Sequence, residues 1–419
     1  MSGWRNYRIA DLGRIVTGKT PPSSQPQLFD GTIPFITPSD MSFHRRHVTT
    51  ERFVSADWDS KQRTLLPEGA VCVVCIGATI GKICMSREPS QTNQQINSVI
   101  VDRARFDQGF VYYVLRTKAD EFVARAAGAA TPIINKTTFS EVEIDAPSLP
   151  MQRRIASILG AYDDLIEVNQ RRIAVLEEMV RGLFEEWFVR FRFPGHEGEP
   201  IIDTPDGPLP EGWRRQAIST VYDGMYDGPH ATPSPSEAGA IFLGIGNITE
   251  TGRIDLSSLR YIAEDDLAKW TKRVTPQEGD IVFTYEATLN RYALIPKGFR
   301  GCLGRRLALI RCNSPLGMNR YLYHYFFTKA WRDVIAKNTL AGATVDRVPL
   351  TRFPEFPITV PPSELLHRFD GVAQPIAKQT EAIEASNRLL AVSRDLLLPR
   401  LISGQLSAAQ VERELEKAA

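Results

Sequence analysis

Apolar residues recur at steps of three and four between residues 151 and 190, whereas most positions between them are polar or charged. This spacing predicts one long α-helix with a narrow apolar seam, as in a coiled coil. A helix of about 40 residues extends on the order of 60 Å. Such a helix is not stable by propensity alone, so its seam needs a partner. The seam positions are Ile155, Tyr162, Ile173, Leu176 and Leu183.

The same pattern returns in the same phase 214 residues later and predicts a second long helix near the C-terminus. Each seam carries an asparagine, Asn169 in the first helix and Asn387 in the second. A polar residue at such a position costs stability but can fix the register of two helices. We therefore expect the two helices to pack antiparallel within the chain, with a globular domain at each end. The seam positions of the second helix are Phe369, Ile376, Leu390 and Leu397.

The segment before the first long helix has the pattern of short strands separated by turns. Strand character is found at Ile33–Thr37, Ala70–Ile76 and Asn97–Val101, between clusters of Pro, Gly, Ser and Asp. Residues 110–127 read as one helix. The stretch 193–212 is rich in Pro, Gly and acidic residues, which predicts a surface linker without secondary structure of its own.

After Trp213 the first half of the chain starts again in a diverged form. Trp58 corresponds to Trp270, residues 67–71 to 276–281, and residues 77–80 to 286–289. The offset between matching positions drifts from 208 to 214 residues, as insertions in loops would produce. A period above about 200 residues indicates duplication of a whole domain, because the repeats of solenoid proteins are far shorter.

The sequence therefore predicts an α+β fold with an internal duplication: two strand-rich globular domains separated by two long antiparallel coiled-coil helices. The expected boundaries are 1–150 for the first domain, 151–192 for the central helix, 193–212 for the linker, 213–362 for the second domain, 363–404 for the C-terminal helix and 405–419 for a tail.

Composition is that of an ordinary globular protein of two to three domains, with 419 residues of which 43% are hydrophobic. We expect neither a signal peptide nor a membrane segment, since no apolar run approaches about 18 residues. The five cysteines, an odd number, favour the reducing cytoplasm.

One string, GRIVTGKT at residues 13–20, matches the phosphate-binding pattern G-x-x-x-x-G-K-[ST]. That pattern needs a helix starting at the lysine, because the helix N-terminus holds the phosphates. Here Pro21 and Pro22 follow immediately, and a proline keeps the preceding residue extended. We therefore interpret the string as a basic loop rather than a nucleotide site.

No other motif predicts catalysis or a metal site. Cys72 and Cys75 lie in a predicted strand, where side chains three apart point to opposite faces, so they are expected to be core residues. We find no G-x-S-x-G, no H-E-x-x-H and no dinucleotide-binding glycines. The chain is expected to have no catalytic activity of its own.

Polar and basic turns recur at equivalent places in the two halves, and they are the candidate nucleic-acid contacts. Arg, Lys, Asn and Gln are the side chains that reach phosphates and base edges most often. The candidates in the first half are Lys19, Thr20, Ser39, Asp40, Arg45, Arg46, Thr79, Lys82, Asn93, Gln94, Gln95, Asn135 and Lys136. Those in the second half are His230, Asn247, Glu286, Asn290, Arg291, Arg305, Arg306 and Arg347.

In its layout and motifs the chain resembles the specificity subunits of type I restriction–modification systems. The similar stretches are GKTPPS (18–23), GATIGK (77–82), TNQQIN (92–97), QRRIASIL (152–159) and LLLPRLISGQL (396–406). The second domain departs most, with EATLNRYALIPKG at 286–298 and LGRRLALI at 303–310.

The resemblance implies a DNA-binding subunit in which each domain reads one half of a split double-stranded DNA site. It further implies that the helices dock two methyltransferase subunits, which use S-adenosylmethionine to methylate adenine. Restriction subunits that use ATP and Mg would complete the assembly. This chain itself would bind no cofactor and no metal.

Two other hypotheses stay open at the level of sequence. The net charge is only +1, and a DNA-binding surface is normally more basic, so a DNA-independent scaffold with ligand- or protein-binding domains on a coiled coil is an alternative. An NTP-hydrolysing enzyme would depend on residues 13–20 alone.

Overall fold

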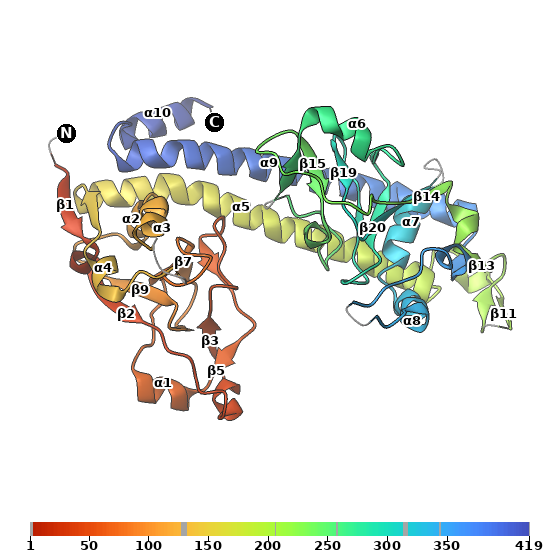
Figure 1. Ribbon diagram of the computed structural model, residues 1–419, viewed down its shortest axis with the longest axis horizontal. Helices are drawn as coiled ribbons and strands as arrows, with labels where there is room; N and C mark the ends of the chain where they lie inside the picture. The colour runs from red at the N-terminus through yellow and green to blue at the C-terminus, as the bar shows by residue number, and fades with distance from the viewer. Residues whose placement is uncertain are drawn as a thin grey trace. The chain divides into compact units, whose positions relative to one another are not determined.

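The computed structural model describes residues 3–126, 132–205, 207–256, 259–312, 317–342 and 345–418. The chain forms two compact units. Unit 1 consists of Met1–Arg172 with Ala382–Ala419, and unit 2 of Ile173–Glu381. Both long helices predicted from the sequence are present, α5 at Leu149–Phe184 and α9 at Ser363–Ile402 (Figure 1). Each of these helices has one part in unit 1 and the other part in unit 2. The fold is thus the expected α+β fold with long helices.

The centre of the domain in unit 1 is a mixed sheet with the strand order β2-β9-β6-β7-β4. A smaller sheet, β5-β3-β8, pairs β3 antiparallel to β5 and parallel to β8. The ends of the domain are joined by the pair β1 and β10. The strands are β1 Arg5–Arg8, β2 Gly13–Thr17, β3 Ile33–Ile36, β4 His47–Val48, β5 Phe53–Val54, β6 Val71–Val74, β7 Ile83–Ser86, β8 Gln91–Thr92, β9 Ile96–Val101 and β10 Glu143–Ala146.

Unit 2 repeats this plan, except that its main sheet has no counterpart of β4 among the described residues. Its main sheet has the order β14-β20-β17-β18, its smaller sheet is β16-β15-β19 with the same antiparallel and parallel pairings, and β13 pairs with β21. The duplication inferred from the sequence is therefore visible in the topology. The strands are β13 Arg214–Ala217, β14 Gly224–Asp227, β15 Ala240–Leu243, β16 Arg260–Ile262, β17 Ile281–Thr284, β18 Tyr292–Leu294, β19 Gly301–Leu303, β20 Leu307–Arg311 and β21 Pro357–Val360.

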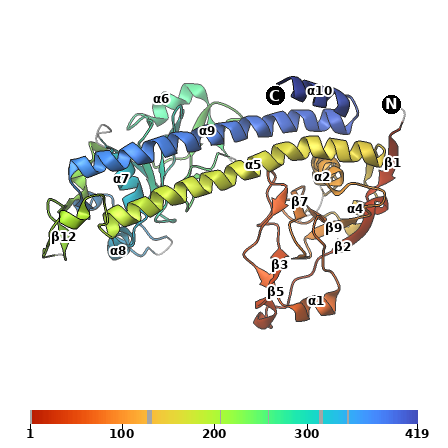
Figure 2. The same ribbon diagram turned by 180° about the vertical axis from the view of Figure 1, so that it is seen from behind.

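Short helices complete each domain. In unit 1 they are α1 Ala56–Gln62, α2 Gln108–Arg116, α3 Ala119–Ala126 and α4 Lys136–Ser140. In unit 2 they are α6 Leu267–Trp270, α7 Met318–Tyr325 and α8 Lys329–Asn338. In both views α1 lies at the far end of its domain from α5, whereas α2 lies close to α5 (Figures 1 and 2).

The single helix predicted over residues 110–127 is wrong, because α2 ends at Arg116 and α3 begins at Ala119. The hydroxyl of Thr117 donates a hydrogen bond to the carbonyl of Val114. This carbonyl is one of the last four of α2, which have no hydrogen-bond donor within the helix. The break lets Phe110 and Phe122 enter the same core, where both are fully buried. Residue 127 lies outside the described residues.

The linker and tail predictions also need correction. Within 193–212, β11 (Ile201–Ile202) pairs with β12 (Leu209–Pro210), so the segment is not free of secondary structure. Phe193 is buried with its ring centroid 5.9 Å from that of Trp213. The expected tail contains a further helix, α10 (Ala408–Ala418), in which Ala408 and Val411 are buried in the core of unit 1. Short apolar pairs such as Ile201–Ile202 carry too little periodic signal to predict these elements.

The two long helices pack antiparallel in unit 1. Asn169 donates a hydrogen bond of 2.8 Å to the side-chain oxygen of Asn387, so the asparagines of the two seams meet. One and a half turns away, Asp163 of α5 forms a buried ion pair with Arg394 of α9. In unit 2 the rings of Phe184 and Phe369 pack with their centroids 5.7 Å apart.

Every predicted seam position is buried or half-buried within its own unit. Those in unit 1 are Ile155, Tyr162, Leu390 and Leu397, and those in unit 2 are Ile173, Leu176, Leu183, Phe369 and Ile376. Over the part of the chain that the structure describes, no helix has the length and hydropathy of a membrane span.

Candidate nucleic-acid interface

The turn after β2 and the turn between β8 and β9 are held together in unit 1. The backbone N–H of Lys19 donates to the carbonyl of Thr92 over 2.9 Å, and the hydroxyl of Thr20 donates to the side-chain oxygen of Gln94. Gly18 has no room for a side chain, because a Cβ there would overlap the carbonyl oxygens of Thr92 and Asn93. The structure therefore brings three predicted contacts, Lys19, Thr20 and Gln94, to one exposed site.

Asn93 and Gln95 connect this site to the turn after β6. Asn93 is buried, and its amide donates to the side-chain oxygen of Gln95 over 2.9 Å. Gln95 in turn donates to the carbonyl of Ile76 over 3.3 Å. Asn93 thus orients its neighbours and is itself inaccessible, while Gln95 remains half-exposed.

The β6–β7 turn and the turn after β3 form a neighbouring group. Lys82 reaches across to donate to the carbonyl of Pro38 over 3.2 Å. Asp40 closes its own turn by accepting from the backbone N–H of Thr37 at 2.7 Å. Ser39 accepts a hydrogen bond of 2.7 Å from Arg52. Thr79 begins the turn that ends at Lys82, because its carbonyl accepts a hydrogen bond from the backbone N–H of that lysine. Its side chain is half-buried.

Asn135 and Lys136 lie at the start of α4. Asn135 caps this helix by accepting from the backbone N–H of Thr138 at 2.8 Å. The backbone N–H of Gly77 donates to the carbonyl of Pro132 over 3.0 Å, which brings the segment before α4 beside the β6–β7 turn. Lys136 is exposed there and carries the charge of this group.

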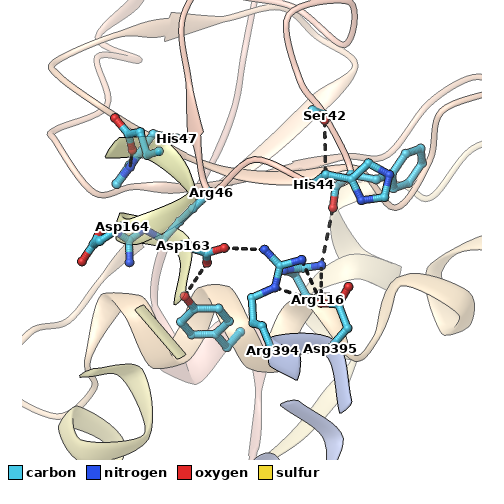
Figure 3. A network of polar contacts seen from close by, with 12 residues as sticks. Ser42, His44, Arg46, His47, Arg116, Asp163, Asp164, Arg394 and Asp395 are labelled. Atoms are coloured by element: carbon cyan, nitrogen blue, oxygen red, sulfur yellow. Dashed lines mark hydrogen bonds and ion pairs between the residues drawn. The ribbon is translucent and has the colours of Figure 1, made fainter. Parts of the chain in front are cut away.

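Arg45 and Arg46 precede β4, which pairs with β7, and Arg46 also reaches helix α5. The Arg46 guanidinium forms an ion pair with Asp164 of α5 and is 17% exposed, so its main role is to fasten the domain to the helix (Figure 3). Arg45 is exposed.

In unit 2 the equivalent site is built around Glu286. Its carboxylate pairs with Arg306 at 3.2 Å, and its backbone forms an isolated bridge with Arg347. Arg305 is exposed beside Arg306, in the turn equivalent to the β8–β9 turn of unit 1. Asn290 adopts the left-handed conformation at φ 60° and accepts from the hydroxyl of Tyr292 over 3.3 Å.

The remaining candidates of unit 2 are engaged with other parts of their own unit. Arg291 donates to the carbonyl of Ile248 over 3.3 Å and pairs with Glu250 at 2.9 Å. Asn247 is buried and donates to the backbone carbonyl of Asp255 over 3.0 Å, so it shapes a turn. His230 is exposed and lies 2.9 Å from the carboxylate of Asp227.

Two arginines at these sites carried no signal in the sequence. Arg52 reaches Ser39 only because β3 pairs with β5, and Arg273 pairs with Asp227 near His230. Both stand in ordinary charged stretches, so only the fold reveals their position.

Neither the phosphate-loop string at residues 13–20 nor the pair Cys72 and Cys75 has the local structure that a nucleotide or metal site requires. Residues 13–17 of the phosphate-loop string form strand β2, and no helix starts at Lys19. Cys72 and Cys75 are buried in different core clusters, on opposite faces of the sheet. Among the described residues no three His, Cys, Asp or Glu side chains are grouped as metal ligands would be.

Two strand-rich domains of one topology, with polar loops at matching places and with long paired helices, define a duplicated recognition protein. A family profile for the type I restriction modification DNA specificity domain matches residues 1–178. Over 422 aligned residues the chain is 24% identical to the type I restriction enzyme MjaIX specificity subunit of Methanocaldococcus jannaschii, covering 97% of this chain and 94% of that protein. The chain is therefore similar to type I restriction–modification specificity subunits, along nearly its whole length in the second comparison and over residues 1–178 in the first.

Two further comparisons show similarity to the same kind of subunit. The HindI specificity subunit of Haemophilus influenzae is 37% identical over 169 residues, 37% of this chain and 35% of that protein. The S subunit of a type I restriction–modification system from M. genitalium has a TM-score of 0.51 at 14% identity, covering 95% of this chain and 96% of that one, which shows a common fold. The domain matched over residues 1–178 is one for DNA specificity.

Proposed function

We propose that this chain is the sequence-specific DNA-binding subunit of a type I restriction–modification complex, with residues 1–150 and 213–362 as its two target recognition domains. Each domain recognises one half of a bipartite, asymmetric site in double-stranded DNA. The observation that carries this proposal is a shared topology with different residues at equivalent turns. Gly18-Lys19 corresponds to Gly228-Pro229, and Asn93-Gln94-Gln95 to Gly304-Arg305-Arg306.

Equivalent glycines support this correspondence. Gly228 leaves no room for a Cβ, which would overlap the carbonyl oxygen of Gly304, just as Gly18 is closed off by Thr92 and Asn93. The backbone of the turns is thus kept, while the side chains on it differ in charge and hydrogen bonding. Such differences are what direct readout of two different base sequences requires.

The long helices provide docking surfaces for two methyltransferase subunits. In unit 1, apolar side chains recur at helical spacing on solvent-exposed positions of both helices, and Leu389 and Leu396 of α9 are 69% and 66% exposed. Apolar side chains exposed in a row mark interaction surfaces. The set in unit 1 is Leu165, Val168, Leu389, Val392 and Leu396, and unit 2 has Val175, Met179 and Val372.

The chemistry of the complex resides in the partners. The methyltransferase subunits supply S-adenosylmethionine, and restriction subunits supply the ATP- and Mg-dependent steps. We place the complex in the cytoplasm, with its DNA substrate.

A binding assay tests the proposal. The chain together with its methyltransferase subunits is titrated with its target duplex and with random duplex over a range of salt concentrations. DNA binding by phosphate contacts gives a steep linear dependence of log affinity on log salt, and a preference for the target duplex shows specificity. A complex that assembles but binds neither duplex would favour the DNA-independent scaffold instead.

A further inference from the structure

A basic pocket lies in unit 1 between residues 44–49 and helix α5. Its cavity of about 100 Å³ has room for a few water molecules or one small oxyanion. Figure 3 shows two of its side chains, Arg46 and His47, beside Asp163 and Asp164 of α5. The lining residues are His44, Arg45, Arg46, His47, Thr49, Arg87, Asp163, Ile166, Glu167 and Gln170.

Both carboxylates of the pocket are already engaged by neighbours. Asp163 pairs with Arg394 and accepts a hydrogen bond of 2.5 Å from the hydroxyl of Tyr113. Glu167 is held by Arg87 and Arg171. Neither acidic group is free to balance a further positive charge in the pocket.

Several hydrogen-bond donors of the pocket are left over. One terminal nitrogen of Arg46 pairs with Asp164, whereas its Nε–H is buried without a hydrogen-bond partner. Arg45, at the exposed mouth, pairs with no carboxylate among the described residues. Burial lowers the pKa of His47 and the charge of the neighbouring Arg46 lowers it further, while Glu167, 3.5 Å from the ring, opposes this shift. Thr49 and Gln170 add exposed polar groups at the rim.

We propose that this pocket binds a phosphate-type oxyanion, with a backbone phosphodiester of DNA as its source in the assembled complex. The inner donor is Arg46 Nε, and Arg45 closes over the anion from the mouth. Arginine suits this task because its guanidinium stays charged and offers several donors in one plane. A phosphate held here contacts the helix and the domain of unit 1 together, and so positions the DNA without reading its sequence. The DNA source rests on the proposed function, whereas the anion site does not.

The first test uses the full chain and inorganic phosphate. Thermal unfolding is measured in phosphate and in chloride of equal ionic strength for the wild type, for the double variant Arg45→Ala/Gln170→Ala and for Arg103→Ala. Arg103 is a matched control, an exposed arginine of unit 1 that donates to the carbonyl of Glu68 over 2.8 Å. Phosphate stabilises proteins in general, so the comparison between variants isolates the site. We expect the double variant to lose most of the phosphate-specific stabilisation and Arg103→Ala to keep it.

The second test measures the affinity of the same proteins for target and random duplex. Losing one phosphate contact lowers the slope of log affinity against log salt by about 0.9, which corresponds to about eightfold weaker binding at 0.1 M salt. We expect this loss for the double variant on both duplexes equally, and none for Arg103→Ala.

The two measurements together distinguish a DNA phosphate from free phosphate as the anion that the pocket binds. If the phosphate effect is lost while the salt slope is unchanged, the pocket takes free phosphate and not DNA. If wild-type protein binds no DNA at all, the proposed function fails while the phosphate measurement still tests the site. If the double variant matches the wild type in both measurements, the anion pocket is refuted.

Discussion

Several polar side chains near the candidate interface serve the fold more than the ligand. Asn93, Asn135 and Asn247 all lie in turns predicted to contact DNA, yet each uses its amide to hold neighbouring backbone or side chains. Asparagine is common in turns for this reason. Among the candidates, the exposed residues Lys19, Gln94 and Arg305 are the better placed to reach a ligand.

The close approach at Gly18 gives a prediction for stability. Gly18→Ala forces a Cβ against two carbonyl oxygens of the β8–β9 turn, and overpacking of this kind costs about 1–3 kcal/mol. Gly182→Ala is the matched control, because Gly182 lies exposed in helix α5 with nothing within 4 Å of an added Cβ. That substitution should stabilise by about 0.5–1 kcal/mol. Urea unfolding midpoints check both values, and equal stability of the two variants would contradict the crowding at Gly18.

Lys19 gives a second prediction at this scale. Because β2 runs into an extended loop and no helix starts at this lysine, MgATP should not shift the thermal unfolding midpoint of the wild type or of Lys19→Ala. A MgATP-induced shift that disappears in Lys19→Ala would show that the loop binds nucleotide after all.

Among the elements, those with long periodic patterns could be predicted from the sequence. The seams of α5 and α9 follow one period for many turns, so the sequence predicts both helices. The break at Thr117 and the hairpin of β11 and β12 could not be predicted. The break depends on burial of the flanking helices in the core of unit 1, and the hairpin is anchored in the core of unit 2 by Leu209 of β12 while β11 is exposed.

The buried ion pair between α5 and α9 distinguishes unit 1 from unit 2. By the offset of 214 residues, Asp163 and Arg394 correspond to Ala377 and Val180, and Val180 is buried in the core of unit 2. Burial and the adjacent Asp163 raise the pKa of Tyr113, so its hydroxyl stays protonated and donates to this carboxylate. Nothing in the sequence marks Arg394 as the partner of Asp163.

A pair of substitutions tests this element. Arg394→Val alone leaves the Asp163 carboxylate buried without its charge partner, which costs about 3–5 kcal/mol. The double variant Asp163→Ala/Arg394→Val installs the residue pair of unit 2 and should recover most of the loss, because no buried charge remains. Denaturant midpoints at constant m-value measure the difference. If the double variant is no more stable than Arg394→Val, charge burial does not explain the cost.

For the molecule as a whole, one topology used twice with different turn residues is the central feature. The sequence allowed the duplication and the long helices to be predicted. The distribution of roles at the interface could not be predicted, since an exposed arginine such as Arg305 and a paired one such as Arg306 look alike in sequence. Only strand pairing decides which turns of a domain meet.

The most direct test of the account is the methylation motif of the assembled complex, read by sequencing modified DNA from cells that express it. We predict two short specified segments that differ in sequence and are separated by unspecified bases. Gln94→Ala should relax bases in one segment only, and Arg305→Ala bases in the other only, because the two residues occupy equivalent turns of different units. A single continuous motif, or relaxation of the same segment by both variants, would contradict the claim that each unit reads its own half of the site.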